Sequence, residues 1–251
     1  MQVVASIQAR MGSSRLPGKV LTEICGKPML LWQVERIRRS RLVDRVIVGT
    51  STSELDDKIE DFCCQNSIEY YRGSEDDVLN RIASLLRHIS ADLHIECCGD
   101  SPLIDPQIID EFIGYYFKNS THAEYFSSAL ETTYPPGLEV TIYPARVLIE
   151  VEKRIAPDDS DREHVGYNIT KYPLRYRQKS LVAPPWFYAP EVYLEVDTKE
   201  DLVLLRKIVA HFVDKGQVHF GLGEILSYLR QQPELIKINQ KVKRRWRKLR
   251  E

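Results

Sequence analysis

Short apolar runs alternate with amphipathic segments through the first 118 residues of the chain. Four apolar runs have the length and composition of buried strands: residues 3–9, 45–50, 68–72 and 93–98. Three segments between them repeat apolar residues at helical spacing: residues 29–39, 54–66 and 76–90. Pro106 after Asp105 marks the start of another helix that extends toward residue 118. This alternation predicts an α/β fold with a mostly parallel sheet and helices on both of its faces.

The second half of the chain has a different pattern. Tyr and Pro become frequent between residues 123 and 190 and the helical pieces shorten, so we interpret 123–190 as an inserted element with strands of its own. Residues 191–196 resemble a last strand, and residues 199–214 a helix that returns to the main body. The tail, 233–251, has the pattern of a basic C-terminal helix. The whole chain, 1–251, is predicted to be a single domain.

Composition limits the class of protein. A chain of 251 residues that is 43% hydrophobic can bury one large core. Its formal net charge of -1 argues against a nucleic-acid or membrane partner, although eight cations lie between Lys237 and Arg250. The sequence does not open on a charged segment with a long apolar run, so we expect a cytoplasmic protein. The five cysteines include two adjacent pairs, at 63–64 and 97–98, which predict reduced, mostly buried thiols and not a metal or redox motif.

The most informative segment is the loop at residues 10–19, which follows directly on the first apolar run. Its two glycines allow the backbone to approach a ligand closely, and Arg10, Arg15 and Lys19 supply positive charge. Such a loop is suited to holding a polyphosphate. It lacks the glycine spacing of a Walker A motif, and Pro17 interrupts any dinucleotide-binding fingerprint. An ordinary surface loop with three scattered cations is the simpler alternative.

Residues 8–19, Gln-Ala-Arg-Met-Gly-Ser-Ser-Arg-Leu-Pro-Gly-Lys, resemble the signature loop of the cytidylyltransferases that make CMP-activated acidic sugars. The similarity is closest to the branch of spore coat polysaccharide biosynthesis protein F, and the acylneuraminate and 3-deoxy-manno-octulosonate cytidylyltransferases are more distant. Four further segments match in order: Gly-Asp-Ser-Pro at 99–102, Gly-Leu-Glu-Val at 137–140, Arg-Glu-His at 162–164 and Val-Asp-Thr at 196–198. The resemblance implies a Rossmann-like, GT-A-like nucleotidyltransferase sheet, in which the inserted element binds the sugar and forms a homodimer.

Two carboxylates are candidates for metal binding. Asp100 follows the run 93–98, and Asp197 follows the apolar residues that end at Val196. Two carboxylates from separate strand ends beside a triphosphate suit Mg²⁺, which prefers oxygen ligands and keeps waters and phosphate oxygens. Either Asp alone is equally well explained as a turn or helix-cap residue. The resemblance implies that Asp100 and Asp197 are the metal ligands.

The resemblance also implies roles for other residues. Arg10, Arg15 and Lys19 are implied to be catalytic, because they stabilise charge that develops on the phosphates. The implied nucleotide-binding residues are Ala9, Arg10, Gly12, Ser13, Ser14, Lys19, Arg72, Asp76, Arg81 and Asp100. The implied sugar-binding residues are Glu139, Arg162, Glu163 and His164.

The residues by themselves leave a structural alternative open for each of these groups. Ser74 or Asp76 would cap the helix that follows, and Arg81 would be an exposed arginine on it. Arg162 and His164 near a helix start would suit the carboxylate of an acidic sugar, or would be only capping and surface charge.

Taken with the resemblance, which alone specifies the cytosine base, these features predict an enzyme that transfers CMP from CTP to an acidic, nonulosonate-type sugar and releases pyrophosphate, for surface polysaccharide or glycan biosynthesis. The expected cofactor is Mg²⁺, and the expected partners are CTP, the sugar and a second copy of the chain. One alternative is a metal-dependent GT-A-type glycosyltransferase, which also places an Asp-bound metal beside a nucleotide. Another is a nucleic-acid-binding protein that uses the basic C-terminal helix.

Overall fold

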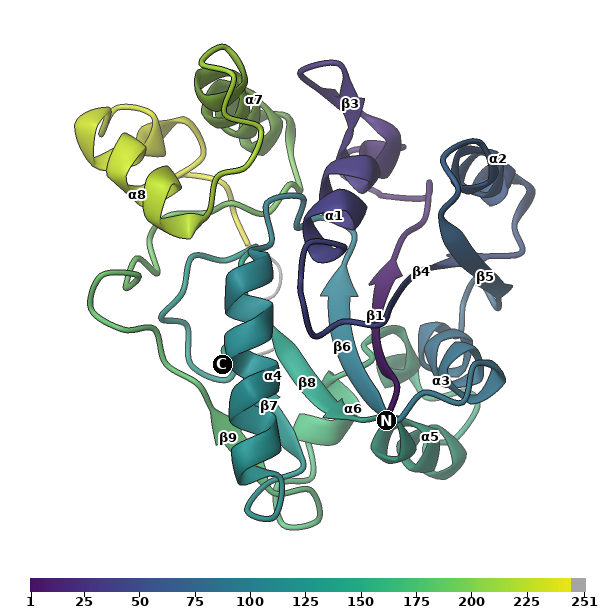
Figure 1. The fold of residues 1–251 in the computed structure, drawn as a ribbon. Helices are drawn as coiled ribbons and strands as arrows, with labels where there is room; N and C mark the ends of the chain where they lie inside the picture. Colours follow the sequence, from purple (N-terminus) through teal and green to yellow (C-terminus); the bar gives the residue numbers. More distant parts are fainter. Residues whose placement is uncertain (245–251) are drawn as a thin grey trace.

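A seven-stranded sheet runs through the centre of the molecule, with the strand order β5-β4-β1-β6-β8-β7-β9 (Figure 1). The computed structural model describes residues 1–244. The strands are β1 (Val3–Gln8), β4 (Arg45–Ser51), β5 (Glu69–Gly73), β6 (Leu93–Cys98), β7 (Tyr125–Ser127), β8 (Thr141–Pro144) and β9 (Gln178–Ser180). Among these strands of the described chain, β8 alone runs against the direction of β1. The predicted mostly parallel sheet is therefore confirmed.

Helices cover both faces of the sheet, as predicted. They are α1 (Met29–Ile37), α2 (Asp57–Gln65), α3 (Val78–His88), α4 (Pro106–Asn119), α5 (Ala145–Arg154), α6 (Tyr167–Thr170), α7 (Lys199–Val213) and α8 (Leu222–Gln231). The remaining short elements are the 3-10 turns Lys19–Leu21, Glu54–Asp56, Ser160–Glu163 and Ile236–Ile238 and the hairpin of β2 (Glu23–Ile24) with β3 (Lys27–Pro28). Within residues 1–244, no helix has the length and apolar character needed to cross a membrane.

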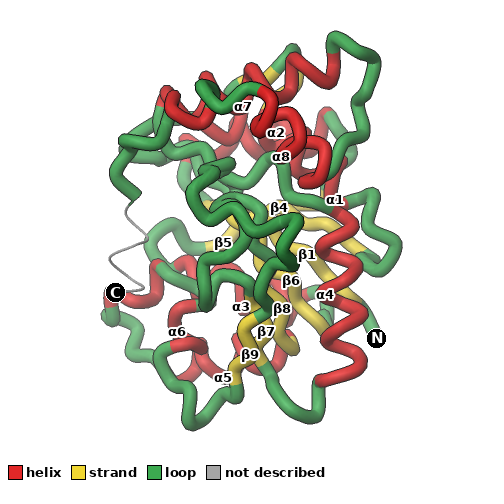
Figure 2. Tube along the Cα trace, turned by 90° about the vertical axis from the view of Figure 1, so that its left-hand side faces the viewer, coloured by secondary structure: helices red, strands yellow, loops and turns green. Residues whose placement is uncertain are grey.

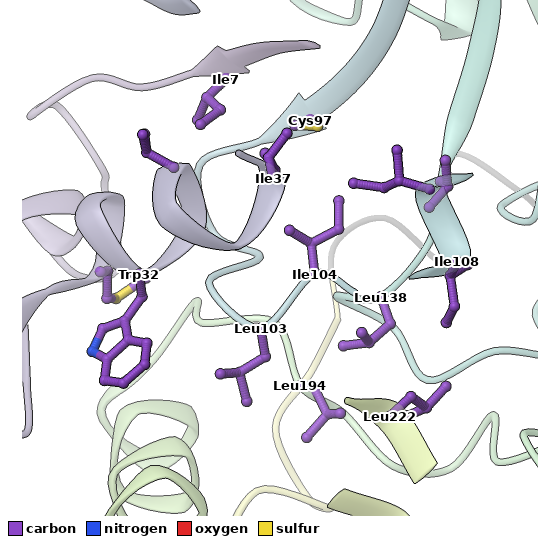
Figure 3. Close-up of a cluster of buried hydrophobic side chains, with 14 of the residues drawn as sticks. Ile7, Trp32, Ile37, Cys97, Leu103, Ile104, Ile108, Leu138, Leu194 and Leu222 are labelled. Carbon is purple, nitrogen blue, oxygen red and sulfur yellow. The ribbon is translucent and has the colours of Figure 1, made fainter. Parts of the chain in front are cut away.

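The two faces of the sheet carry two hydrophobic cores, because successive side chains of a strand point to opposite sides. Ala5 and Ile7 of β1 join the core that is filled by α1, α2, α4, α7 and α8, whereas Val4 joins the core under α3, α5 and α6. In Figure 2, α1 and α4 lie on one side of the strands and α3 and α6 on the other. Figure 3 shows part of the first core, where Ile7 and Cys97 of the sheet approach Ile37 of α1.

The strand register brings three loops to one edge of the sheet. Gln8, the last residue of β1, lies opposite Gly49 of β4 and Cys98 of β6. Because these strands are parallel, the loops that follow them leave the sheet side by side at the carboxyl edge. Ligands of open α/β sheets bind at this edge.

The segment 123–190 contributes strands of its own, β7, β8 and β9, and these strands extend the central sheet. Strand β8 pairs antiparallel with β6, with Ile142 opposite Ile95, and β7 and β9 follow outward. Without β8, strand β6 would be an edge with unpaired backbone groups.

Two predictions for the second half of the chain were wrong. Residues 191–196 do not form a strand, because their backbone hydrogen bonds go singly to loops: Leu194 N donates to Pro136 O (2.7 Å) and Val196 N to Asp100 O (2.8 Å). The alternating apolar side chains are nevertheless buried in the core. The predicted C-terminal helix is also absent from residues 233–244, which contain only the turn Ile236–Ile238; residues 245–251 lie outside the described part.

The expectation of mostly buried thiols was wrong as well. All five cysteines are free, and Cys25, Cys64 and Cys98 are exposed, whereas Cys63 and Cys97 are buried. In each adjacent pair one thiol is buried and the other is exposed, because neighbouring side chains on a helix or a strand point in different directions.

His94 is a buried polar residue on β6. Its Nε2 atom lies 2.7 Å from the Ser6 hydroxyl on β1, and its ring contacts Tyr143 edge-on at 5.0 Å between centroids. Burial lowers the pKa of His94 to about 3. The folded protein therefore keeps this ring neutral through most of the acidic range.

We expect His94 to make the protein less stable as the pH falls. Below the unfolded pKa of 6.5, His94 in the unfolded chain binds a proton that the folded chain takes up only near pH 3. The free energy of unfolding therefore falls by about 2 kcal/mol between pH 7 and pH 5. Urea denaturation at both pH values should show that His94→Gln loses about 2 kcal/mol less than the wild type. The exposed His122→Gln should follow the wild type, and equal losses in all three proteins would contradict this assignment.

Candidate active site

The phosphate-binding candidate, residues 10–19, forms a closed loop after β1. Ala9 N donates to Gly49 O (3.2 Å) and so continues the pairing with β4 for one residue. Met11 then closes the loop, since its carbonyl accepts from Ser13 N and Gly18 N, both at 2.9 Å. Gly12 and Ser14 at the tip are exposed, and a Cβ atom at Gly12 would meet no other atom within 4 Å. The tip thus presents backbone toward open space, as a polyphosphate site requires.

Asp56, in the 3-10 turn that follows β4, anchors this loop to the end of β4, a role that the sequence analysis missed. One carboxylate oxygen accepts from Met11 N (2.7 Å), and the other accepts from Ser51 N (3.1 Å), the Ser51 hydroxyl (2.5 Å) and the Thr50 hydroxyl (3.1 Å). Asp56 is almost fully buried. The Thr-Ser-Thr-Ser run at 50–53 was the available signal, because short polar residues after a strand commonly satisfy a buried carboxylate.

Lys19 brings the two predicted metal ligands together. Its Nζ atom lies 2.9 Å from Asp197 Oδ1 and 3.4 Å from Asp100 Oδ2, and it also donates to Val196 O (2.8 Å). Arg15 pairs with the other oxygen of Asp197 at 2.5 Å. Burial alone would lower the pKa of Lys19, but the two carboxylates outweigh it and raise the pKa above its ordinary value. Four predicted residues from three separate segments therefore converge at the carboxyl edge of the sheet.

Close backbone packing places Asp100 at this point. A Cβ atom on the preceding residue, Gly99, would lie 2.6 Å from Gln8 O, so only glycine lets the turn after β6 approach the end of β1. The Asp100 carbonyl accepts from Val196 N (2.8 Å), which joins this turn to the segment that carries Asp197.

The donor set at this point fits Mg²⁺. Two carboxylates face one cationic atom, the Lys19 ammonium, and both offer hard oxygen donors. Residues 1–244 contain no group of three or more His, Cys, Asp or Glu side chains that could hold a metal ion. The pair would therefore need further oxygen ligands from phosphate and water, which is how Mg²⁺ commonly binds beside nucleotides.

Arg10 and Arg81 form a second basic group at the loop. Arg10 is partly exposed and pairs with Glu163 at 2.8 Å across the cleft, which lowers the pKa of Glu163. Arg81 is buried, contrary to the alternative of an exposed arginine, and donates to Glu75 O (3.3 Å) and to Ser74 O. Burial lowers the pKa of Arg81, and the charge of Arg10 nearby lowers it further. The two guanidinium groups are thus near enough for their charges to interact.

Arg72 and Asp76 do not join the cluster around Lys19. The Arg72 guanidinium donates to Ser51 O (2.8 Å) and Ser53 O (2.9 Å) and pairs with Asp57 and Glu60 of α2, so it fixes the loop after β4. Asp76 is exposed. The N-cap of α3 is the next residue, Asp77, which accepts from Asn80 N at 2.8 Å; the expectation of Ser74 or Asp76 in that role was wrong.

A pocket of about 580 Å³ opens next to Asp100. Three of the four predicted sugar-binding residues line it, namely Glu139, Glu163 and His164. Further lining residues that the sequence analysis did not single out are Gln8, Glu96, Tyr125, Tyr167, Lys171 and Glu195. The pocket contains more carboxylates than cations, so it offers many acceptors for hydroxyl groups.

Arg162 faces away from this pocket. Its guanidinium is buried and pairs with Asp77 (2.8 Å) and Glu152 (3.2 Å), and it also donates to Ile155 O (2.8 Å). The side chain therefore joins the turn Ser160–Glu163 to α3 and α5. The structure brings the neighbouring Glu163 and His164 to the cleft, but it does not bring Arg162 there.

Glu96 forms part of the pocket floor. It accepts from the Tyr143 hydroxyl (2.7 Å), Gly166 N (3.2 Å) and Gln8 Nε2 (3.4 Å), and burial raises its pKa. These bonds fix the start of α6 against the sheet. An acidic residue inside a mostly apolar strand was the signal in the sequence, since buried charges need specific partners.

Comparison with known proteins agrees with this geometry. The profile of the family described as cytidylyltransferase matches residues 4–221. Spore coat polysaccharide biosynthesis protein SpsF of Bacillus subtilis is 32% identical over 232 residues, which cover 91% of this chain and 94% of that protein. A 3-deoxy-manno-octulosonate cytidylyltransferase of Trichlorobacter lovleyi is 37% identical over 122 residues, 47% of this chain and 46% of that protein.

Comparison with solved structures also finds cytidylyltransferases. A cytidylyltransferase from Leptospira borgpetersenii superposes with a TM-score of 0.88 at 25% identity, covering 97% of this chain and all of that one. CMP:2-keto-3-deoxy-manno-octonic acid synthetase, solved with CTP, has a TM-score of 0.61 at 19% identity over 84% of this chain and 99% of its own, which shows a shared fold. These matches favour nucleotidyl transfer over the glycosyltransferase and nucleic-acid-binding alternatives. The chain therefore belongs to the cytidylyltransferase family.

Proposed function

We propose that this protein transfers CMP from CTP to an acidic, nonulosonate-type sugar, with Mg²⁺ as the cofactor, in the synthesis of a surface polysaccharide or glycan. The observation that carries the proposal is the convergence of Arg15 and Lys19 with Asp100 and Asp197 beside an open pocket. The loop cations suit a triphosphate, the carboxylates suit its metal, and the pocket has room for an acceptor.

The reaction follows from this arrangement. A hydroxyl oxygen of the sugar forms a bond to the α-phosphorus of CTP, the bond from that phosphorus to the bridging oxygen breaks, and pyrophosphate leaves with the electron pair. The hydroxyl proton passes to solvent or to a nearby base. Bound Mg²⁺ would neutralise phosphate charge between Asp100 and Asp197. Arg15 and Lys19 hold the departing phosphates and stabilise the charge that grows on them, so no covalent enzyme intermediate is needed.

The acceptor side of the proposal is supported by the polarity of the pocket. Glu96, Glu139 and Glu195 provide acceptors for sugar hydroxyls, and His164 and Lys171 are the basic groups on the lining that suit a sugar carboxylate. The names of the two sugar-acid enzymes among the similar proteins agree with an acidic acceptor.

The proposal includes a cytoplasmic homodimer that forms through the segment 123–190. Several large apolar side chains in this segment are exposed, Leu174, Val182 and Trp186 among them. Exposed apolar groups gathered in one segment are common at subunit contacts.

The direct test is incubation of the protein with CTP, Mg²⁺ and a panel of sugar acids, with pyrophosphate release and CMP-sugar formation followed by mass spectrometry. We expect Asp100→Asn and Asp197→Asn each to lose at least about 99% of turnover while their circular dichroism and melting temperatures stay near wild type, because neither carboxylate supports the core. Turnover at the wild-type rate in either variant at saturating Mg²⁺ would exclude the two-carboxylate site.

Lys19→Ala should weaken CTP binding more than CMP binding. The contact that is lost goes to the departing phosphates, which CMP lacks, so we expect about a tenfold or larger loss for CTP and a change of about twofold or less for CMP. Titration calorimetry of both nucleotides measures the difference. Lys118→Ala, which removes an exposed cation on α4, is the matched control, and an equal loss for the two nucleotides would refute the assignment.

His164 and Arg162 should have separate effects. His164→Ala should raise the sugar KM or lower kcat, with kcat/KM about ten- to hundredfold lower and CTP binding unchanged. Arg162→Met should lower the free energy of unfolding by about 2–4 kcal/mol, because it leaves Asp77 and Glu152 without their buried partner.

Steady-state kinetics and urea denaturation separate the two roles. Arg146→Met, which removes an exposed pair with Glu124, should cost less than about 1 kcal/mol. A stable Arg162→Met protein with a raised sugar KM would show that Arg162 reaches the acceptor after all.

A further inference from the structure

Asp201, at the first turn of α7, sits behind the loop that carries Asp197. It is fully buried. Its Oδ2 atom accepts from three groups at the active-site turn: Asp197 N (3.0 Å), Thr198 N (2.8 Å) and the Thr198 hydroxyl (3.1 Å). This half of the contact is the capping box of α7, which fixes the backbone that presents the Asp197 carboxylate.

The other oxygen of Asp201 is held from a distant part of the chain. Oδ1 accepts from Asn239 Nδ2 (2.8 Å) and from Arg244 NH2 (2.7 Å), which lie 38 and 43 residues further along. We call residues 233–244 the C-terminal strap. In Figure 1 the segment that follows α8 runs back toward the centre of the molecule. A helix cap needs only one of these oxygens, so the strap contacts require a separate explanation.

The strap also holds the start of the same loop. Asn239 Nδ2 donates to Tyr193 O (3.0 Å), and the Arg244 guanidinium lies 4.4 Å from the centre of the Tyr193 ring and 3.4 Å from Glu195. The Arg244 side chain is only 1% exposed. Asn239 and Arg244 therefore contact residues on both sides of Asp197.

The loop that carries Asp197 is tightly packed on the side that faces away from the strap. Leu194 is packed into the core near Leu103 and Leu222 (Figure 3). Gly137, at φ 98°, lies directly against the backbone of Leu194 and Glu195, where a Cβ atom would overlap with main-chain atoms. The position of Asp197 is thus set between a packed core on one side and the strap on the other.

We propose that Arg244 and Asn239 are positioning residues for Asp197, which they hold in place through Asp201. The inference rests on the proposed function in that it takes Asp197 as a ligand of the divalent ion. Partners that orient a metal ligand typically change metal affinity 10- to 100-fold when they are removed. The strap is tied to the phosphate loop as well, since Arg15 donates to Lys243 O (3.4 Å).

The test uses the full chain and two measurements that do not depend on turnover. Mn²⁺ is titrated with and without CTP, in the absence of acceptor, and water-proton relaxation separates protein-bound Mn²⁺ from the Mn·CTP complex. Hydrogen–deuterium exchange of peptides that cover residues 194–201 reports on the loop itself. The variants are Arg244→Met and the milder Asn239→Ala, and Lys241→Met is the matched control because Lys241 is an exposed cation of the same strap.

We expect Arg244→Met to bind Mn²⁺ about 10- to 100-fold more weakly and to exchange faster at 194–201, with β1 and β6 unchanged. Asn239→Ala should show smaller changes in the same direction, and Lys241→Met none. Wild-type Mn²⁺ affinity in both strap variants would overturn the proposal, even if exchange increased. If Arg244→Met does not fold, the Mn²⁺ affinity of Asn239→Ala tests the proposal.

The proposed function can fail separately from this inference. If wild-type protein binds no Mn²⁺ with or without CTP, the metal assignment fails. Exchange at 194–201 then decides alone: unchanged exchange in Asn239→Ala would show that the strap does not fix the loop, and faster exchange that it does.

Discussion

The site depends on one electrostatic constraint, which is that two carboxylates at the end of the sheet share a single ammonium group. Asp100 and Asp197 would repel each other if no cation lay between them, and part of their hydration is lost at this depth. Lys19 supplies the counter-charge, and Arg15 adds a second cation on the far oxygen of Asp197. The same two cations come from the loop that binds phosphate in our proposal. Arrival of a triphosphate with its metal would therefore exchange one set of charge partners for another, and the carboxylates would be neutralised in both states.

The sheet makes this constraint possible because it fixes where each segment begins. Strands β1 and β6 end at the same level and β4 ends two residues further on, so the loop at residues 10–19, the Asp56 turn and the Asp100 turn start near one another. Gly99 permits a backbone approach that any side chain would block, and Asp56 ties the phosphate loop to β4. The position of Asp197 is different in kind. It arrives on a loop whose backbone bonds go to other loops, so its placement relies on side-chain packing and on Asp201.

The parts of the structure that could be predicted are those that local pattern controls. Apolar periodicity located the four parallel strands and four helices of the first 118 residues, though not the short β2–β3 hairpin, and the parallel order then implied where Arg15, Lys19 and Asp100 would meet. The wrong predictions share a physical cause, because in each case partners far away in the sequence determine the structure. The alternation at 191–196 correctly indicated buried side chains but not that Pro136 and Asp100 would take the backbone bonds. Arg162 adjoins Glu163 in a motif, yet two carboxylates from α5 and the α3 cap hold it away from the pocket.

The basic tail shows why charge counts alone mislead at this end of the chain. Eight cations between Lys237 and Arg250 indicated a solvated helix or a nucleic-acid contact, but Arg244 is buried against Asp201 and Glu195. A buried pair of this kind contributes little net stability, because the cost of removing both charges from water offsets their attraction. The pair instead fixes the orientation of the Asp201 side chain, because a carboxylate held at both oxygens cannot rotate. In the proposed function Lys19 and Arg15 exchange Asp197 for phosphate, whereas Arg244 bonds to Asp201, which is fully buried. The loop can therefore exchange the partners of its carboxylate while its backbone stays in place.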